Sequence, residues 1–180
     1  MLKVIESDDG ETLDFAESRA FALADHQHSH VFVKDADPKT IKKVASVFKK
    51  QPGIAAVLTG DAIAKYGLDH PRSGEVVLVS EPTSWQAYYW WEDDAKAPRF
   101  ARNVDIHRKP GYDPVELFVD KKTKTIPLDA SLVKGSHGAP VTTPAQRGVL
   151  LSSEAGIFQG PTVADVDVAS IVLRQFDTQI

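Results

Sequence analysis

The chain contains no cysteine, which excludes disulfides and thiolate metal sites and is consistent with a reducing compartment. No apolar run approaches the roughly 18 residues that a membrane-spanning helix needs. The N-terminus also lacks the apolar stretch of a signal peptide. We therefore expect a cytoplasmic protein with no membrane partner.

An excess of positive charge is also missing. The chain has 21 Lys and Arg against 25 Asp and Glu, a net charge of −4, so nothing indicates a nucleic-acid partner. Hydrophobic residues make up 42% of the 180 residues and charged residues 26%, which is ordinary for a globular protein. This length suits one domain, or one domain with a small appendage.

The first half of the chain alternates between strand and helix patterns. Asp37 can cap a helix that has Pro38 in its first turn, and apolar residues then recur at helical spacing until about residue 51. A short helix is predicted at residues 61–66. Strands are predicted at residues 19–24, 29–33, 54–58, 75–80 and 84–91. The pattern predicts an α/β fold: a small sheet with a βαβ-type unit and helices on its face or faces.

The second half is less regular. Residues 92–114 read as a long loop, a kind of segment that is often functional. Beyond it we predict short strands at 115–119 and 148–151 and a closing helix at 165–176. We expect residues 1–120 to form one α/β subdomain and residues 121–180 to form a C-terminal segment.

Histidines gather in the stretch "ADHQHSH". On a strand, His26, His28 and His30 would share one face, because successive side chains alternate. Three imidazoles on one face can bind a metal, with Asp25 orienting one of them. The alternative is a polar strand edge whose histidines meet water.

Two further stretches carry candidate binding residues. In "DIHRKPGYDP", Arg108 and Lys109 could hold a phosphate, and His107 and Asp113 could bind a metal or relay a proton. The alternative is a turn with solvated charges. The aromatic run at residues 85–91 could stack a nucleobase or sugar, or it could be core.

The stretch "LVKGSHGAP" places His137 between two glycines. Glycines let the backbone turn sharply and approach another group closely, and imidazole is the commonest metal ligand. By spacing alone, an ordinary turn histidine explains the pattern better than a metal ligand does. Ser136 beside His137 does not indicate serine chemistry, because adjacent side chains rarely point at each other.

Taken in order, "GLDHPRSGEVVLVSEPTSWQAYYWWEDDAKAPRFARNVD", "VDIHRKPGYDPVELF" and "IPLDASLVKGSHG" resemble type I phosphodiesterase/nucleotide pyrophosphatase-like proteins of the alkaline phosphatase superfamily. The resemblance covers most of the chain. It implies an α/β fold with a mostly parallel central sheet and hydrolysis of phosphate esters by two divalent metal ions, zinc being the expected one. The family's last metal ligand is a histidine in a Gly-x-His-Gly motif, which implies that His137 is a ligand.

The departures from the family are informative. The family's Thr or Ser nucleophile lies in a long N-terminal part that has no counterpart in this chain. Asp25-His26 resembles an Asp-His-Gly ligand pair of the family, but Gln27 replaces the glycine, so the role is not transferred.

We therefore expect a C-terminal portion of a phosphodiester or nucleotide pyrophosphate hydrolase, inactive alone, in which residues 1–120 are an insert or cap-like subdomain. The N-terminal catalytic part and a phosphate-ester small molecule are the expected partners. A second copy of the chain is a further candidate partner. A non-catalytic α/β binding module and a pseudoenzyme are the alternative functions.

Overall fold

A computed structural model describes residues 1–103 and 118–178 of the chain. The chain divides into two compact units, Met1–Ala139 and Pro140–Ile180. The first unit contains the sheets, and it also contains the Gly135–Gly138 stretch. The division predicted at residue 120 stays a prediction.

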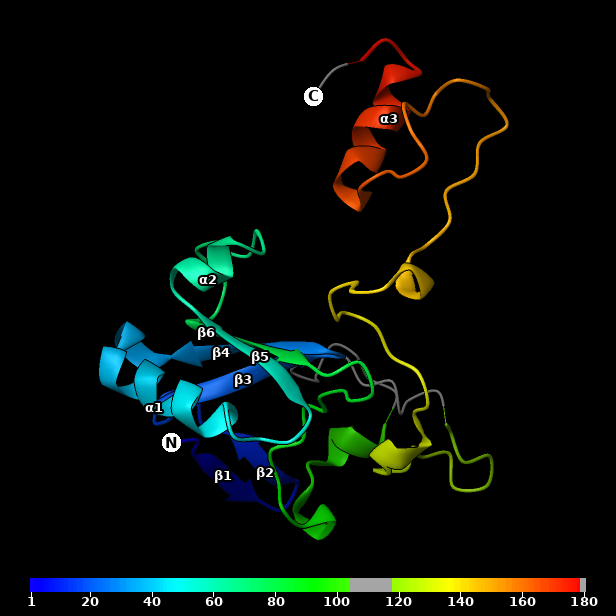
Figure 1. Cartoon of the computed structure of the whole chain (residues 1–180). Coiled ribbons are helices and arrows are strands. Elements are labelled where there is room, and N and C mark those ends of the chain that lie inside the picture. The colour runs from blue at the N-terminus through cyan, green and yellow to red at the C-terminus, as the bar shows by residue number, and fades with distance from the viewer. Residues whose placement is uncertain (104–117, 179–180) are drawn as a thin grey trace. The chain divides into compact units, whose positions relative to one another are not determined.

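The first unit is built on a four-stranded sheet (Figure 1). Its strand order is β3-β4-β6-β5, and every neighbouring pair is antiparallel. A separate hairpin pairs β1 with β2. The strand bounds are Val4–Ser7 for β1, Gly10–Leu13 for β2, Ala20–Asp25 for β3, His28–Val33 for β4, Ile54–Thr59 for β5 and Val76–Ser80 for β6.

The βαβ-type unit takes a split form. Helix α1, Pro38–Phe48, connects β4 to β5, and the Asp37 carboxylate caps it by accepting from the Lys39 and Thr40 backbone N–H groups. Because β4 and β5 are both antiparallel to β6, they run in the same direction with β6 between them. The described residues therefore form a mixed α/β fold, but their sheet is antiparallel, unlike the mostly parallel sheet that the resemblance implies.

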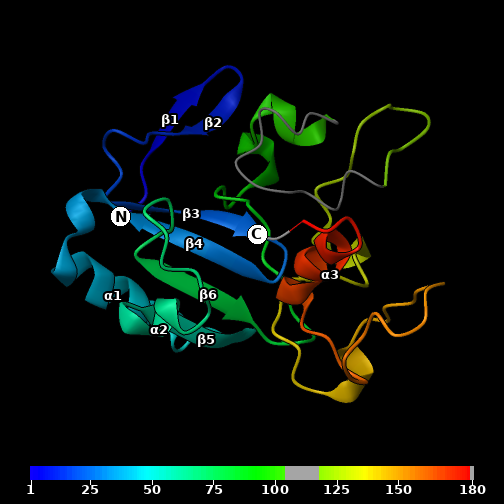
Figure 2. The same ribbon diagram turned by 90° about the horizontal axis from the view of Figure 1, so that it is seen from above.

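Strand β6 is buried on both faces, which explains its unbroken apolar sequence. On one face, Val76 and Leu78 pack with Val44 of α1. On the other, Val77 and Val79 pack with Leu58 and with Ile63 of the short helix α2, Asp61–Ala64. The two helices thus cover opposite faces of the β5–β6 half of the sheet (Figures 1 and 2).

The predicted strand at residues 84–91 is wrong: this segment has no strand pairing. Tyr88 and Trp91 instead bury themselves in a cluster with Ala24 and Ala101. The rings meet edge-on, with centroids of Tyr88 and Trp91 5.8 Å apart. A strand would turn alternate rings to opposite faces, whereas an irregular path packs neighbouring rings together.

The predicted long loop is ordered where the structure describes it. Residues 92–103 form two 3₁₀ helices, Asp94–Lys96 and Arg99–Arg102. They dock against the β1–β2 hairpin, where Lys96 Nζ lies 2.9 Å from Glu6 Oε1 and 3.0 Å from Glu11 Oε1. Residues 104–114 of this loop lie outside the described residues.

The second unit has little regular structure. Its helix α3, Val168–Arg174, follows a 3₁₀ turn at Asp165–Asp167, which confirms the predicted closing helix. The predicted strand at 148–151 is wrong: Val149 and Leu151 are more than four-fifths exposed, and no described strand pairs with them. Most of the strand predicted at 115–119 lies outside the described residues.

A candidate histidine site at the turn between strands β3 and β4

A tight turn at His26 and Gln27 joins β3 to β4. Asp25 pairs with His28, so only these two residues form the loop. His26 adopts a φ of 50°, a left-handed conformation that is uncommon for a residue other than glycine. Both loop residues are only 7% exposed. Such backbone strain is found often at functional sites, which makes the turn a candidate.

The stretch Gly135–Ala139 lies against this turn. The backbone N–H of Gln27 donates to the carbonyl oxygen of His137 at 3.0 Å. The amide oxygen of Gln27 accepts from the Ala139 N–H at 3.4 Å, and its Nε2 donates to the Ser84 carbonyl at 3.0 Å. Gln27 therefore ties together three segments that are far apart in sequence.

Two imidazoles meet at this contact. The ring centroids of His26 and His137 are 4.0 Å apart, with the planes tilted by 31°. His26 Nδ1 lies 3.0 Å from Ser136 Oγ. Burial lowers the pKa of His26, and the neighbouring His137 lowers that pKa further because two positive charges would repel. Both effects favour the neutral imidazole, which is the metal-binding form.

Only one of the two flanking glycines is required by the packing. Gly138 has a φ of 107°, and a Cβ built on it would lie 3.0 Å from His28 Nδ1. Gly135 has no heavy atom within 4 Å of such a Cβ. The two glycines therefore differ in their roles. Gly138 allows the loop to approach the turn closely, whereas an alanine would fit at Gly135.

The three clustered histidines do not share one strand face, contrary to the sequence-based expectation. His28 and His30 do share a face of β4, with ring centroids 5.9 Å apart. His26 instead lies in the turn, where alternation no longer holds. Asp25 Oδ2 is 3.8 Å from His28 Nε2. His30 Nδ1 accepts from the Gly74 N–H at 3.2 Å, and burial lowers the His30 pKa.

The part of the chain that the structure describes contains no complete metal site. No group of three or more His, Asp or Glu side chains there is arranged to hold a metal ion. His26 and His137 could supply two imidazole nitrogens, whereas a structural zinc site usually has four protein ligands and a catalytic one has three.

The other predicted site residues have different outcomes. The candidate phosphate-binding and relay residues in "DIHRKPGYDP" all lie outside the described residues: His107, Arg108, Lys109 and Asp113. The aromatic run, offered as a stacking platform, has Tyr88 and Trp91 in the core, 6% and 7% exposed. Those two rings have no open face for a ligand.

Sequence reasoning missed two contributors, Ser136 and Gln27. Ser136 was set aside because it adjoins His137, but its hydroxyl bonds a different histidine, His26. Gln27 was noted only as a departure from glycine, although it carries most of the hydrogen bonds that hold the turn. No local pattern signals either role, because both depend on contacts between distant segments.

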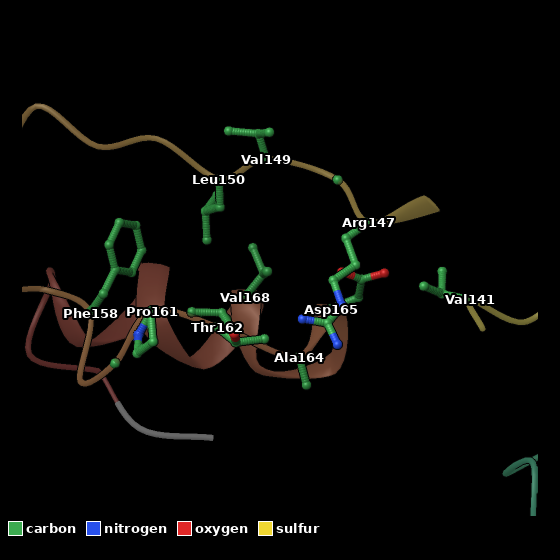
Figure 3. Close-up of a pocket in the computed structure, with 13 residues that line it drawn as sticks. Val141, Arg147, Val149, Leu150, Phe158, Pro161, Thr162, Ala164, Asp165 and Val168 are labelled. Atoms are coloured by element: carbon green, nitrogen blue, oxygen red, sulfur yellow. The ribbon is translucent and has the colours of Figure 1, made fainter. Parts of the chain in front are cut away.

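A pocket of about 550 Å³ lies in the second unit (Figure 3). Figure 3 shows Leu150, Phe158 and Val168 turned toward this space, with Arg147 and Asp165 as its charged lining residues. Its volume suits a small ligand. Its lining comes from loop segments, the Asp165–Asp167 turn and the start of α3, and it contains no histidine, so it offers no further imidazole for a metal.

No helix in the described part of the chain is long and apolar enough to cross a membrane. No protein-family model, curated protein or solved structure matches the chain. The residues of the chain and their geometry therefore carry the functional proposal.

Proposed function

We propose that this chain contributes metal-binding imidazoles, those of His137 and His26, to a metal-dependent hydrolase of phosphate esters. The observation that carries the proposal is the 4.0 Å approach of the two rings at a strained turn. The Gly135–Gly138 stretch supports it, since it is similar to the last ligand motif of phosphodiesterase/nucleotide pyrophosphatase-like proteins. In this proposal the antiparallel sheet belongs to an insert or cap-like subdomain of an alkaline-phosphatase-like fold, and is not its mostly parallel central sheet.

The hydrogen bonds around the turn suit metal binding by His26. When the Nδ1–H of His26 donates to Ser136 Oγ, the ring is held in the tautomer whose Nε2 carries a lone pair, and the hydroxyl fixes the ring orientation. Gln27 holds the backbone of His137 in place through the 3.0 Å bond to its carbonyl. The chain thus positions two imidazole donors before any metal arrives.

A divalent metal, zinc in the first instance, would act there as a Lewis acid on a phosphate oxygen. In this proposal the nucleophile and further ligands come from the N-terminal catalytic part expected as a partner, so the isolated chain is expected to be inactive. His107, Arg108, Lys109 and Asp113 remain our candidates for contacts to the phosphate ester. Arginine and lysine suit this task because their N–H groups bind phosphate oxygens with charge assistance.

Calorimetric titration of the whole chain with Zn²⁺ and with Mn²⁺ tests the proposal. We expect one site that is lost in His137→Ala and in His26→Ala. His70→Ala is the matched control, because His70 is an exposed histidine elsewhere in the first unit. The site should persist in a His28→Ala/His30→Ala double variant, whereas adventitious metal binding on β4 should be lost. Unchanged metal binding in His137→Ala contradicts the proposal.

Activity is a separate readout. A bis-aryl phosphodiester assayed with added Zn²⁺ or Mn²⁺ should show no turnover by this chain alone. Turnover that disappears in His137→Ala would show that the chain holds a complete active site, and would refute the expected inactivity.

A non-catalytic binding module, or a pseudoenzyme, is the second candidate. It is favoured by the incomplete ligand set among the described residues. The same calorimetry distinguishes this candidate from the hydrolase proposal. A protein without a metal role should show no metal binding that depends on His26 and His137.

A further inference from the structure

The pocket of the second unit has a charged end and an apolar end. Figure 3 shows Arg147 and Asp165 at one end of the pocket and Phe158 at the other. Leu150 and Val168 lie between them. The volume of about 550 Å³ is within the usual range of small-molecule sites. A ligand that matches this pocket therefore has a charged head and an apolar body.

Both charged residues lie on short turns whose backbone is hydrogen-bonded. Arg147 directly follows the 3₁₀ turn Pro144–Gln146, and its backbone N–H donates back into that turn at 3.1 Å. The amide oxygen of Gln146 accepts from the Thr143 N–H at 2.9 Å, which holds the turn closed. Asp165 is the first residue of the 3₁₀ turn that leads into α3. The two charges are therefore carried by backbone with a defined conformation.

Neither charge is neutralised within the part of the chain that the structure describes. Arg147 and Asp165 form no ion pair there, either with each other or with another residue. Both residues are exposed, so water solvates the two charges in the free protein. Opposite charges that line one pocket without pairing can contact two different groups of one ligand. The pocket therefore suits a ligand that carries both a negative and a positive charge.

This mixed charge discriminates between classes of ligand. A phosphate monoester carries close to two negative charges, which Asp165 would repel. A simple carboxylate would pair with Arg147 but would leave Asp165 without a cation, and a simple amine would do the reverse. A zwitterion satisfies both residues, because its carboxylate and its ammonium group can each form charge-assisted hydrogen bonds.

The apolar end indicates what the rest of the ligand is. Leu150 is 43% exposed, and Phe158 and Val168 are only partly buried, so apolar surface is open to a ligand. Gly148 and Gly160 also line the pocket, and they add no side chain that would fill it. Covering this surface with an aromatic or branched aliphatic group would stabilise a complex, since apolar area leaves water.

From this arrangement we propose that the pocket binds a zwitterionic α-amino acid with an apolar side chain, such as L-phenylalanine or L-leucine. The carboxylate of the ligand contacts Arg147, and its ammonium group contacts Asp165. Its side chain lies against Leu150, Phe158 and Val168. The proposal is independent of the proposed metal role, because the pocket is not lined by a histidine.

An NMR titration of the whole chain with three ligands tests this proposal without any variant. L-Phenylalanine carries both charges, hydrocinnamate lacks the ammonium group, and phenethylamine lacks the carboxylate. We expect L-phenylalanine to bind about tenfold or more tightly than the other two, since each of them loses one charge-assisted contact. The amide signals that shift should belong to residues that line the pocket. Equal or tighter binding of hydrocinnamate overturns the proposal, as does the absence of L-phenylalanine binding at millimolar concentrations.

Substitutions in the second unit test each contact. Arg147→Gln should weaken L-phenylalanine binding by about tenfold or more, and Asp165→Asn should abolish the preference for L-phenylalanine over hydrocinnamate. Arg174→Gln and Asp167→Asn are the matched controls, because these residues carry the same charges in the same unit but do not line this pocket. Unchanged affinity in Arg147→Gln, or an unchanged preference in Asp165→Asn, refutes the proposal.

A last control separates this pocket from the histidine turn, because free amino acids also chelate metal ions. His137→Ala should bind L-phenylalanine as the wild type does. Loss of binding in His137→Ala would assign the amino acid to a metal at that turn and overturn the proposal.

Discussion

The imidazole rings of His26 and His137 lie with their centroids 4.0 Å apart. One ring belongs to a strained two-residue turn, and the other to a loop that reaches the turn from far along the chain. The pair is held by backbone and glutamine hydrogen bonds, so changes to either segment should be felt at the other.

The pKa of His26 should respond to His137. In the wild type we expect the His26 pKa below its usual 6.5, because burial and then the neighbouring imidazole disfavour the charged ring. In His137→Ala the second cause is removed, so the His26 pKa should rise toward the usual value. A pH titration followed by NMR of the ring Cε1–H signals measures the His26 pKa in the wild type and in the variant. An equally low His26 pKa in the variant contradicts the coupling.

This lowered pKa also makes stability depend on pH. The unfolded chain binds a proton at His26 more readily than the folded chain does. The folded state is therefore favoured most above the unfolded-state pKa of about 6.5, where His26 is neutral in both states. This stability is lost as the pH falls below 6.5 toward the folded-state pKa. Urea unfolding between about pH 5 and pH 8 should show stability rising with pH. His137→Ala should show a shallower rise.

Gly138 and Gly135 should differ sharply when each is changed to alanine. Gly138→Ala places a Cβ 3.0 Å from His28 Nδ1 at a φ of 107°, so we expect a loss of about 1–3 kcal/mol. Gly135→Ala meets no atom within 4 Å and should stay within about 0.5 kcal/mol of the wild type. Chemical denaturation measures both. Equal effects would show that the loop does not pack on the turn as described.

Glu75 should stabilise the C-terminal end of β4. Its carboxylate accepts from the buried Val33 N–H at 2.6 Å, beyond the last residue that β6 pairs. Glu75→Ala leaves that donor without an acceptor and should cost about 1–3 kcal/mol, whereas Glu75→Gln keeps an acceptor oxygen and should cost less. Glu81→Ala, at an exposed glutamate, is the control. Thermal unfolding of the three variants ranks them.

Lys96 should hold the β1–β2 hairpin in place. It lies 2.9 Å from Glu6 and 3.0 Å from Glu11, and both carboxylates raise its pKa. Glu11 is only 9% exposed, so Lys96→Gln leaves a largely buried carboxylate without its cation. Amide hydrogen exchange in the hairpin should become faster. Lys42→Gln, an exposed lysine on α1, should leave that exchange unchanged.

The sequence predicted the elements whose signals are local. Capping by Asp37 and helical spacing predicted α1, and the short apolar runs predicted β5 and β6. The aromatic run at residues 85–91 misled, because bulky rings signal both strands and irregular core segments. Strand direction was also beyond a local reading, since nothing in the run Val76–Ser80 reveals that it inserts between β4 and β5.

The candidate site was predictable only in part. His137 and His26 stood out as residues, but their approach depends on contacts across more than half of the chain. The alternation rule correctly paired His28 with His30 and failed at His26, because a turn ends the alternation. Ser136 and Gln27 had no local signal, since a hydroxyl and an amide find their partners only after the fold has formed.

The packing of the Gly135–Ala139 stretch on the β3–β4 turn also has a consequence for folding kinetics. The β3–β4 hairpin needs only a two-residue loop, so it can form within microseconds. The bond between His26 and Ser136 joins residues 110 positions apart and has to wait for a much larger part of the chain to become ordered. We expect the histidine pair to assemble late, so a probe on His137 would report completion of the first unit and not its beginning.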